Sequence, residues 1–451
     1  MIGAANNTGA LLLARYVLPV RPAHTLLDEH AVRVVDGRID ALLPAAEAVR
    51  RYPDDERIDL PEHVLMPGLI NAHTHSPMTL LRGYADDLAL EPWLREHIWP
   101  AEQRWVSPEF VRDGTRLALA EMLRGGVTCF NEMYFFPDVM AETVERAGLR
   151  AVIGVPIIDV PTPWARGIDD CLDKARALVA DWSSSDRIDI ALAPHAPYTV
   201  DDAGLSATVM LADEQGVLIA MHVLEASWEV ANSKRQHGVG TLERLERLGV
   251  LGERFIAVHV VQVDEDDIAR LALTGTQVVH CPESNLKLAS GVSPVPELLR
   301  GGVNVSIGTD GAASNNNLDL LGEARTAALL AKGVSGDPEA LDAWQTLDLL
   351  TINGARALGK GSELGSIEVG KRADLAAMDL SAPETQPLHE VHAQLVYSAS
   401  SRQFTDVWVE GRRLLAEGEP TSEELRRAAE VGPVWKDRLQ ERVAPSKSVQ
   451  A

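Results

Sequence analysis

The chain has 451 residues, enough for one large α/β barrel with a smaller unit beside it, and a formal net charge of −24. No basic cluster offsets this charge, which argues against a nucleic-acid partner and favours a neutral or cationic small molecule. The three cysteines (Cys129, Cys171 and Cys281) make no disulfide framework, and no apolar run approaches the ~20 residues of a membrane helix, so we expect a cytoplasmic protein that does not contact membranes.

Short strand-like segments occupy both ends of the chain, with a turn at Asp36-Gly37. They span residues 11–20, 30–42, 57–65, 364–370, 374–379 and 407–414. We therefore predict that residues 1–64 and 365–420 pair into one small β-sandwich. The charged, proline-interrupted residues 421–451 predict a helical surface tail with a frayed end.

Residues 65–364 alternate between strand-like and helix-like segments. Eight strand-like segments end at His75, Glu132, Asp159, His195, Glu225, His259, His280 and Asp310. Charged stretches with helical periodicity, such as 108–124 and 137–147, separate most of them. Eight successive β-then-α units predict a (β/α)8 TIM barrel, whose active site lies at the C-terminal ends of the strands.

Metal-binding side chains gather at these predicted strand ends. His73 and His75 close the first strand, and because side chains alternate along a strand they point to the same side and can bind one ion together. His222 on the fifth strand and Asp310 on the eighth would complete four ligands, with water as a fifth. A single strand-end histidine is as often a core residue, but the joint pattern in barrel order favours a divalent metal site.

Short motifs at the strand ends are weak alone but specific in combination. They are Pro67 to His75, Pro194-His195, His222 to Glu225, Val258-His259, His280 to Gly291 and Gly308 to Gly311. Together they resemble the amidohydrolase superfamily over nearly the whole chain. Within it, the sequence is most similar to the branch of cytosine deaminases, guanine deaminases and triazine hydrolases, and above all to methylthioadenosine/S-adenosylhomocysteine deaminases.

The resemblance implies one divalent metal ion per subunit, because no lysine near His195 could be carboxylated to bridge two ions. Zn²⁺ suits the ligands best, and Fe²⁺, Mn²⁺ or Co²⁺ could occupy them as well. The resemblance also implies that Glu225 protonates a ring nitrogen and the leaving amine, that His259 stabilises the developing alkoxide, and that Asp310 is both ligand and general base. Glu225 could instead be an ordinary helix-start carboxylate, and His259 a packing residue.

The connection after the first strand, residues 76–106, is too long for a simple loop and predicts a lid over the barrel mouth. In the nucleoside deaminases that the chain resembles, a tryptophan of this segment packs near the base, and a glutamate nine residues later binds the ribose hydroxyls. Trp93 and Glu102 match these positions, and His195 resembles a further histidine that contacts substrate. Alternatively, Trp93 or Trp99 only packs the lid helix and Glu102 is solvated.

One departure from the family narrows the expected substrate. Family members that accept S-adenosylhomocysteine often have an arginine after the third strand. In this sequence Val155 aligns at that position. The carboxylate of the homocysteine tail would therefore lack a guanidinium that could bind both of its oxygens. We therefore expect attack of metal-bound hydroxide on C6 of 5′-methylthioadenosine, giving 5′-methylthioinosine and ammonia.

Other activities on the same fold stay open. They are deamination of S-adenosylhomocysteine or adenosine, a guanine or cytosine deaminase, and a triazine chlorohydrolase. A non-catalytic scaffold with a decayed site is a further alternative, which the complete ligand set disfavours. By analogy with related enzymes, we expect a homo-oligomer.

Overall fold

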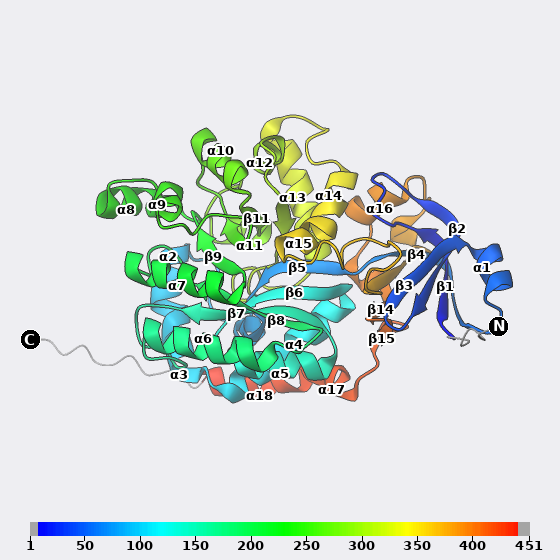
Figure 1. Cartoon of the computed structure of the whole chain (residues 1–451), viewed down its shortest axis with the longest axis horizontal. Coiled ribbons are helices and arrows are strands. Elements are labelled where there is room, and N and C mark those ends of the chain that lie inside the picture. Colours follow the sequence, from blue (N-terminus) through cyan, green and yellow to red (C-terminus); the bar gives the residue numbers. More distant parts are fainter. Residues whose placement is uncertain (1–7, 441–451) are drawn as a thin grey trace, which may run out of the picture.

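The computed structural model of the chain describes residues 8–440 and contains two eight-stranded sheets. One is a parallel barrel from the middle of the sequence, and the other is assembled from both ends of the chain (Figure 1). Within the described range, no helix has the length and apolarity needed to cross a membrane.

The barrel strands pair in parallel and in sequence order, which confirms the predicted (β/α)8 barrel. They are β5 (Leu69–Thr74), β6 (Val127–Met133), β7 (Arg150–Ile157), β8 (Ile188–Pro194), β9 (Ile219–Val223), β10 (Phe255–His259), β11 (Gln277–His280) and β12 (Val305–Ile307). A backbone bridge between Thr74 and Asp310 brings the end of the barrel back to its first strand. All eight C-terminal strand ends therefore meet at one mouth.

Helices follow the strands, and most of them bury an apolar face against the barrel. They are α4 (Pro108–Arg124), α5 (Pro137–Ala147), α6 (Ile168–Trp182), α7 (Asp202–Gln215), α8 (Ser227–His237), α9 (Thr241–Arg247), α10 (Glu265–Thr274), α11 (Pro282–Lys287), α12 (Val295–Arg300), α13 (Leu320–Ser335), α14 (Ala343–Leu350) and α15 (Ile352–Ala357). The start of α4 shows the local cause, because the Ser107 side chain caps the helix by accepting the Phe110 N–H. Both α4 and α5 have the predicted bounds.

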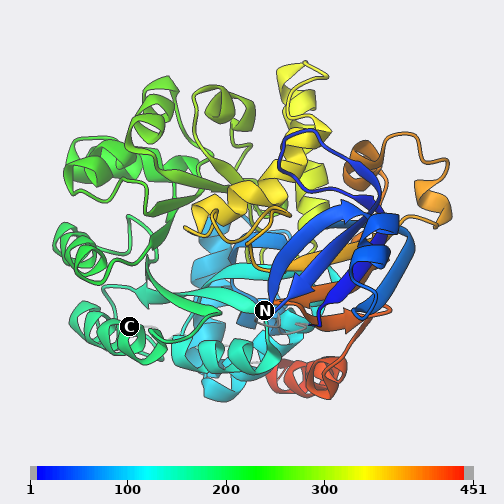
Figure 2. The ribbon, with the colours of Figure 1, turned by 45° about the vertical axis from the view of Figure 1, so that its right-hand side comes forward.

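The second sheet joins the two ends of the chain, as expected. Its order is β16 (Glu419–Pro420), β15 (Arg412–Ala416), β14 (Phe404–Val409), β13 (Leu375–Asp379), β4 (Glu56–Pro67), β1 (Ala10–Val17), β2 (Leu27–Val35) and β3 (Arg38–Pro44). Figure 2 shows the N-terminal strands beside the C-terminal ones. Short helices α1 (Ala45–Arg51) and α16 (Val391–Tyr397) lie in its connections. The predicted turn at Asp36 and Gly37 links β2 to β3, with φ of 49° and 76°.

Two predicted strand bounds are wrong. The run from Val64 to His75 forms two strands, because β4 continues to Pro67 in the terminal sheet and β5 begins only at Leu69. Gly68 between them lies so close to Thr128 that an added Cβ would meet that side chain at 2.2 Å. The predicted boundary at residue 64 therefore falls inside β4, and the division into domains stays a prediction. Residues 364–370 form no strand, because Gly365 and Gly370 have φ of 80° and 93°.

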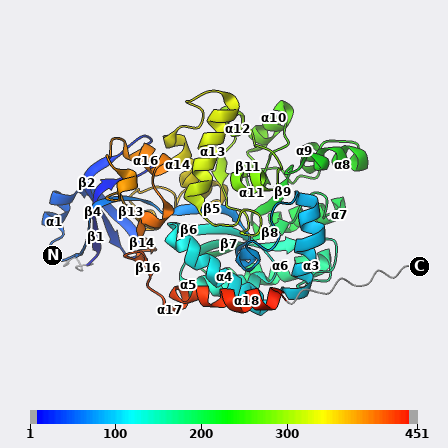
Figure 3. The ribbon, with the colours of Figure 1, turned by 180° about the vertical axis from the view of Figure 1, so that it is seen from behind.

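The C-terminal tail lies along the barrel. Helices α17 (Glu423–Arg426) and α18 (Val431–Gln440) run beside α4, as Figure 3 shows from behind. The Trp435 indole donates a hydrogen bond to Asp113 at 2.9 Å, and its ring meets Phe110 edge-on. The frayed end predicted for the tail falls on residues 441–451, outside the described residues.

Candidate metal centre and active site

The four predicted metal ligands converge at the barrel mouth, where their ligand atoms all lie within 4.8 Å of one another. The Nε2 atom of His222 is 3.2 Å from the Nε2 atoms of both His73 and His75. Oδ1 of Asp310 lies 3.4 Å and 3.1 Å from the same two atoms. Donors bound to one ion at ~2.0–2.1 Å lie about 2.9–3.6 Å apart, also when a fifth position is left for water. The donor set therefore fits one divalent metal ion.

Hydrogen bonds on the far side of two histidine rings fix their orientation. Nδ1 of His75 pairs with the Met133 carbonyl oxygen, and Nδ1 of His222 pairs with the His195 carbonyl oxygen at 2.8 Å. A carbonyl only accepts, so each Nδ1 carries the proton and donates it. The Nε2 lone pairs are thus left facing the metal site.

Asp310 is held by two serines. Its Oδ2 atom accepts hydrogen bonds from the Ser284 and Ser314 hydroxyls, both at 2.7 Å, while Oδ1 faces the histidines. The backbone of Asp310 has a φ of 57°, in the left-handed region that costs a non-glycine residue about 1–3 kcal/mol. The strain lies in the backbone of Asp310, and the two serine hydrogen bonds fix the position of its carboxylate.

Glu225 and His259 lie side by side next to the ligands. Oε2 of Glu225 is 3.7 Å from Nε2 of His259, and Ser290 donates a long 3.5 Å hydrogen bond to Oε1. Nδ1 of His259 pairs with the side-chain oxygen of Asn285 at 2.9 Å. Burial, and then the charge of Asp310, raises the pKa of Glu225 to about 8, so this carboxyl holds a proton at neutral pH.

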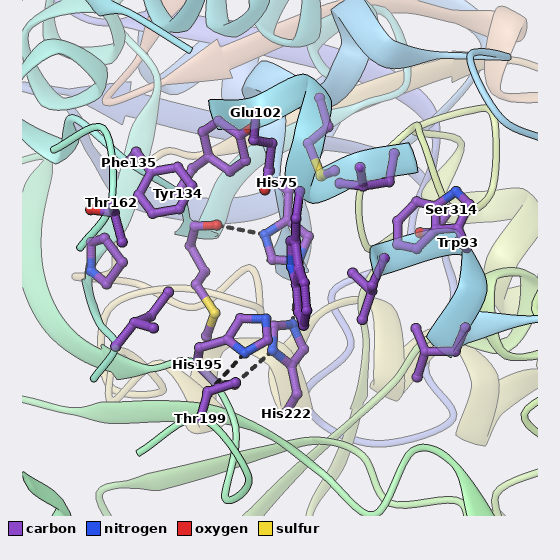
Figure 4. Close-up of a pocket in the computed structure, with 18 of the residues that line it drawn as sticks. His75, Trp93, Glu102, Tyr134, Phe135, Thr162, His195, Thr199, His222 and Ser314 are labelled. Carbon is purple, nitrogen blue, oxygen red and sulfur yellow. Dashed lines mark hydrogen bonds between the residues drawn. The ribbon is translucent and has the colours of Figure 1, made fainter. Parts of the chain in front are cut away.

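A cavity of about 700 Å³ opens above this centre (Figure 4). The predicted lid covers it with η1 (Ser76–Leu81), α2 (Leu90–Pro92), the π-helical turn η2 (Trp93–Ile98) and α3 (Trp99–Trp105). Trp93 and Glu102 both line the cavity, with Tyr134 beside Glu102. The Trp93 indole N–H is buried without a hydrogen-bond partner in the described part of the chain, and the buried Tyr134 hydroxyl lies against Glu102. Buried polar groups that face a cavity in this way are available to a ligand.

Burial also shifts the pKa values of two predicted substrate contacts. It raises the pKa of Glu102 to about 7, although the Tyr134 hydroxyl beside it acts in the opposite direction. Burial, together with the neighbouring histidines, lowers the pKa of His195 to about 4. His195 lines the cavity, and its Nδ1 lies 3.1 Å from the Thr199 hydroxyl. A neutral His195 therefore keeps its other ring nitrogen for a ligand.

Val155 does not report on the charge of the substituent at the 5′ carbon of the substrate, so this prediction used the wrong residue. It is fully buried in β7 and does not line the cavity. Its side chain lies on the opposite face of the strand from Val152, which packs in the barrel interior, because side chains alternate along β7. Pro156 and Ile158, further along the same strand end, line the cavity in its place.

Several residues of the site were not identified from the sequence. Ser284 and Asn285 stand inside the motif His280 to Gly291, and Ser314 follows Asp310 by four residues, so proximity to a motif was the available signal. Tyr134 follows β6, a strand that carried no motif, and nothing in the sequence pointed to it. His280, a predicted strand-end residue, is buried but does not line the cavity.

The sequence profile of the amidohydrolase family matches residues 64–414. The chain belongs to this family. It is 44% identical over 426 residues to a protein of Teredinibacter turnerae named 5-methylthioadenosine/S-adenosylhomocysteine deaminase, covering 94% of this chain and 96% of the relative. It is 45% identical over 367 residues to a 5′-deoxyadenosine deaminase of Methanothermobacter thermautotrophicus, covering 81% and 85%.

A solved structure extends the likeness from sequence to fold. The crystal structure of an adenosine deaminase from Xanthomonas campestris with bound zinc superposes with a TM-score of 0.95. That protein is 51% identical to this amidohydrolase, over 96% of this chain and 99% of its own. The expected family and fold are thus confirmed.

Proposed function

We propose that this amidohydrolase removes the 6-amino group of 5′-substituted adenosines, converting 5′-methylthioadenosine to 5′-methylthioinosine and ammonia. The observation that carries the proposal is the position of the Glu225 carboxyl, which lies against His259 and lines the cavity beside the metal ligands. The names of the two relatives and of the solved structure support it, since each denotes an adenosine or substituted-adenosine deaminase.

His73, His75, His222 and Asp310 would hold the metal ion, for which we propose Zn²⁺. When bound, such an ion lowers the pKa of water and supplies the nucleophile at neutral pH. The three neutral imidazoles and one carboxylate suit Zn²⁺, and Fe²⁺, Mn²⁺ and Co²⁺ prefer similar donors. A bound adenine would lie with C6 toward this centre.

The residues around the metal ligands move the protons. Asp310 accepts a proton from the attacking water, because its carboxylate lies at the centre with Oδ1 facing the histidine ligands. Glu225 gives its own proton to N1 of the ring, which makes C6 more electrophilic. It then carries the proton of the new C6 hydroxyl to the amine, which leaves as ammonia, and the proton held by Asp310 returns Glu225 to its acid form. His259 stabilises the negative charge that develops on the attacking oxygen.

Residues of the lid and of the cavity wall determine which nucleoside binds. Trp93 offers a ring face and an unpartnered indole N–H to the base, and Glu102 accepts from the ribose hydroxyls. Tyr134 extends the ribose contact with its hydroxyl, which lies beside Glu102. His195, which also lines the cavity, contacts the substrate through its free ring nitrogen. Free bases and triazines have no ribose for Glu102 and Tyr134, which disfavours guanine, cytosine and triazine substrates.

The cavity wall favours an uncharged tail at the 5′ carbon. No lysine or arginine is found among the described residues that line the cavity, whereas Leu94, Ile158 and Val160 give it an apolar surface. A carboxylate tail would lose hydration there without gaining a cationic partner. This reasoning replaces the one based on Val155, and it again places methylthioadenosine ahead of S-adenosylhomocysteine.

Two further proposals concern the cellular setting. The three cysteines are buried and unpaired, which suits the reducing cytoplasm. By analogy with related enzymes, we propose a homo-oligomer that acts on a small nucleoside, without nucleic acid or membrane.

A panel of 5′-substituted adenosines tests the proposal. It contains methylthioadenosine, 5′-deoxyadenosine, adenosine and S-adenosylhomocysteine, each followed by ultraviolet absorbance as adenine becomes hypoxanthine. We expect the highest kcat/KM with methylthioadenosine and at least a ~10-fold lower value with S-adenosylhomocysteine. Equal values for the two would overturn the tail assignment. No turnover of any member, by protein with one metal ion per chain, would overturn the activity and favour the scaffold.

A further inference from the structure

Glu229 stands in the first turn of α8, four residues after Glu225, and turns its carboxylate back toward the end of β9. One carboxylate oxygen accepts hydrogen bonds from the backbone N–H groups of Glu225 at 2.9 Å and Ala226 at 2.8 Å. The other accepts from the N–H of Leu224 at 3.2 Å. The residue is 5% exposed, so these bonds are shielded from water.

The turn that Glu229 holds is strained. Leu224 has a φ of 53°, a conformation that a leucine side chain disfavours by about 1–3 kcal/mol. On its other side, the Leu224 carbonyl accepts from the N–H groups of Val261 at 3.0 Å and Gln262 at 2.9 Å, beyond the end of β10. The turn is therefore fixed between a buried carboxylate and the next strand end.

The side chain of Glu225 has little else to direct it. Its contacts with described residues are the long 3.5 Å hydrogen bond from Ser290 and the 3.7 Å approach to His259. Where the Glu225 carboxyl lies is thus decided mainly by the backbone from which it projects. A shift of that backbone by about 1 Å is enough to lower a reaction rate by ~10²-fold.

We propose that Glu229 is a positioning residue, whose carboxylate binds three successive backbone N–H groups and thereby aims Glu225 at the substrate ring. The inference rests on the proposed function, in which Glu225 carries the proton. Glu229 itself touches neither substrate nor metal. It acts through Glu225, as a side-chain anchor for the turn.

A glutamine at position 229 tests this assignment with little change of shape. Its amide oxygen can keep the bonds from Glu225 and Ala226, but its NH₂ group faces the Leu224 N–H, which loses its acceptor. In Glu229→Gln we expect kcat for methylthioadenosine to fall by ~10-fold or more, with KM changed by less than ~3-fold and the metal content unchanged. Glu229→Ala, which removes every acceptor, should lower kcat further.

A double-mutant cycle separates positioning from general support of the fold. In the Glu225→Gln background, adding Glu229→Gln should lower the residual kcat by less than ~2-fold, because the group that Glu229 aims is already disabled. The same factor in both backgrounds would overturn the proposal, as would unchanged kcat in Glu229→Gln alone. The matched control is Asp267→Asn, which alters the third-residue carboxylate of the α10 capping box, does not line the cavity and should leave kcat unchanged.

Hydrogen exchange gives a readout that does not depend on the reaction. Amides of residues 224–226 should exchange slowly in the wild type and at least ~10-fold faster in Glu229→Ala, with most other amides unchanged. Equal protection in both proteins would show that Glu229 does not hold the turn. An inactive wild type with the expected exchange pattern would refute the proposed substrate and not the anchor.

Discussion

Ser284 and Ser314 should control how tightly the metal ion binds, although neither touches it. Each hydroxyl donates a 2.7 Å hydrogen bond to Oδ2 of Asp310, the ligand whose other oxygen faces the histidines. A hydrogen bond to a charged acceptor contributes about 1.5–3 kcal/mol. Because that energy orients a ligand, losing it should weaken metal binding ~10–100-fold. We expect this change in the Zn²⁺ Kd of Ser314→Ala and of Ser284→Ala, and a larger one in the double variant.

Competition with a chromophoric chelator measures these Kd values at fixed pH. Ser335→Ala is the matched control, since its hydroxyl bonds only backbone groups at the exposed end of α13, donating to the Ala331 carbonyl and accepting from the Asp337 N–H, and its Kd should equal that of the wild type. The unfolding midpoint of each apo variant should stay near that of the wild type. If both single variants and the double variant bind Zn²⁺ within ~2-fold of wild type, the assigned role of the two serines is wrong.

Further predictions address the proton donor, the ribose contact and the junction of the two sheets. Glu225→Gln should lower kcat by ~10²–10⁴-fold while the bound metal, measured by elemental analysis, stays the same. Because the pKa of Glu225 is about 8, its carboxyl loses its proton above that pH. We therefore expect kcat/KM to fall steadily from pH 8 to about 9.5. A kcat/KM that stays level over this range would rule out Glu225 as the acid. Tyr134→Phe should raise KM for methylthioadenosine by ~2–10-fold and leave it unchanged for the 2′,3′-dideoxy analogue. Asp374→Leu leaves the buried Arg150 guanidinium without its nearest carboxylate, 3.0 Å away, and should cost ~3 kcal/mol in urea unfolding.

The metal ligands could be predicted from sequence because barrel topology converts strand order into position. Once eight strands were counted, His73, His75, His222 and Asp310 had to meet at one mouth, and they do. Regular helices were equally predictable, since the apolar periodicity and caps of α4 and α5 fix them locally.

The features that were not predicted depend on local geometry, which the periodicity of apolar residues in the sequence does not encode. The change of sheet at Gly68 requires the close approach of Thr128, a contact between distant segments. Val155 was misplaced because a shift of one residue along a strand moves a side chain to the other face. Tyr134 acts through a hydroxyl beside Glu102, and Glu229 acts through backbone N–H groups; neither arrangement has a sequence motif.

The central claim is that this amidohydrolase is a metal-dependent deaminase of methylthioadenosine. Its most direct test is the amount of ammonia released when protein with one bound Zn²⁺ ion is mixed with a known amount of methylthioadenosine. The account predicts one ammonia and one 5′-methylthioinosine per substrate consumed, with activity lost on chelation and restored by Zn²⁺. Unchanged methylthioadenosine after many hours with fully metal-loaded protein would contradict it.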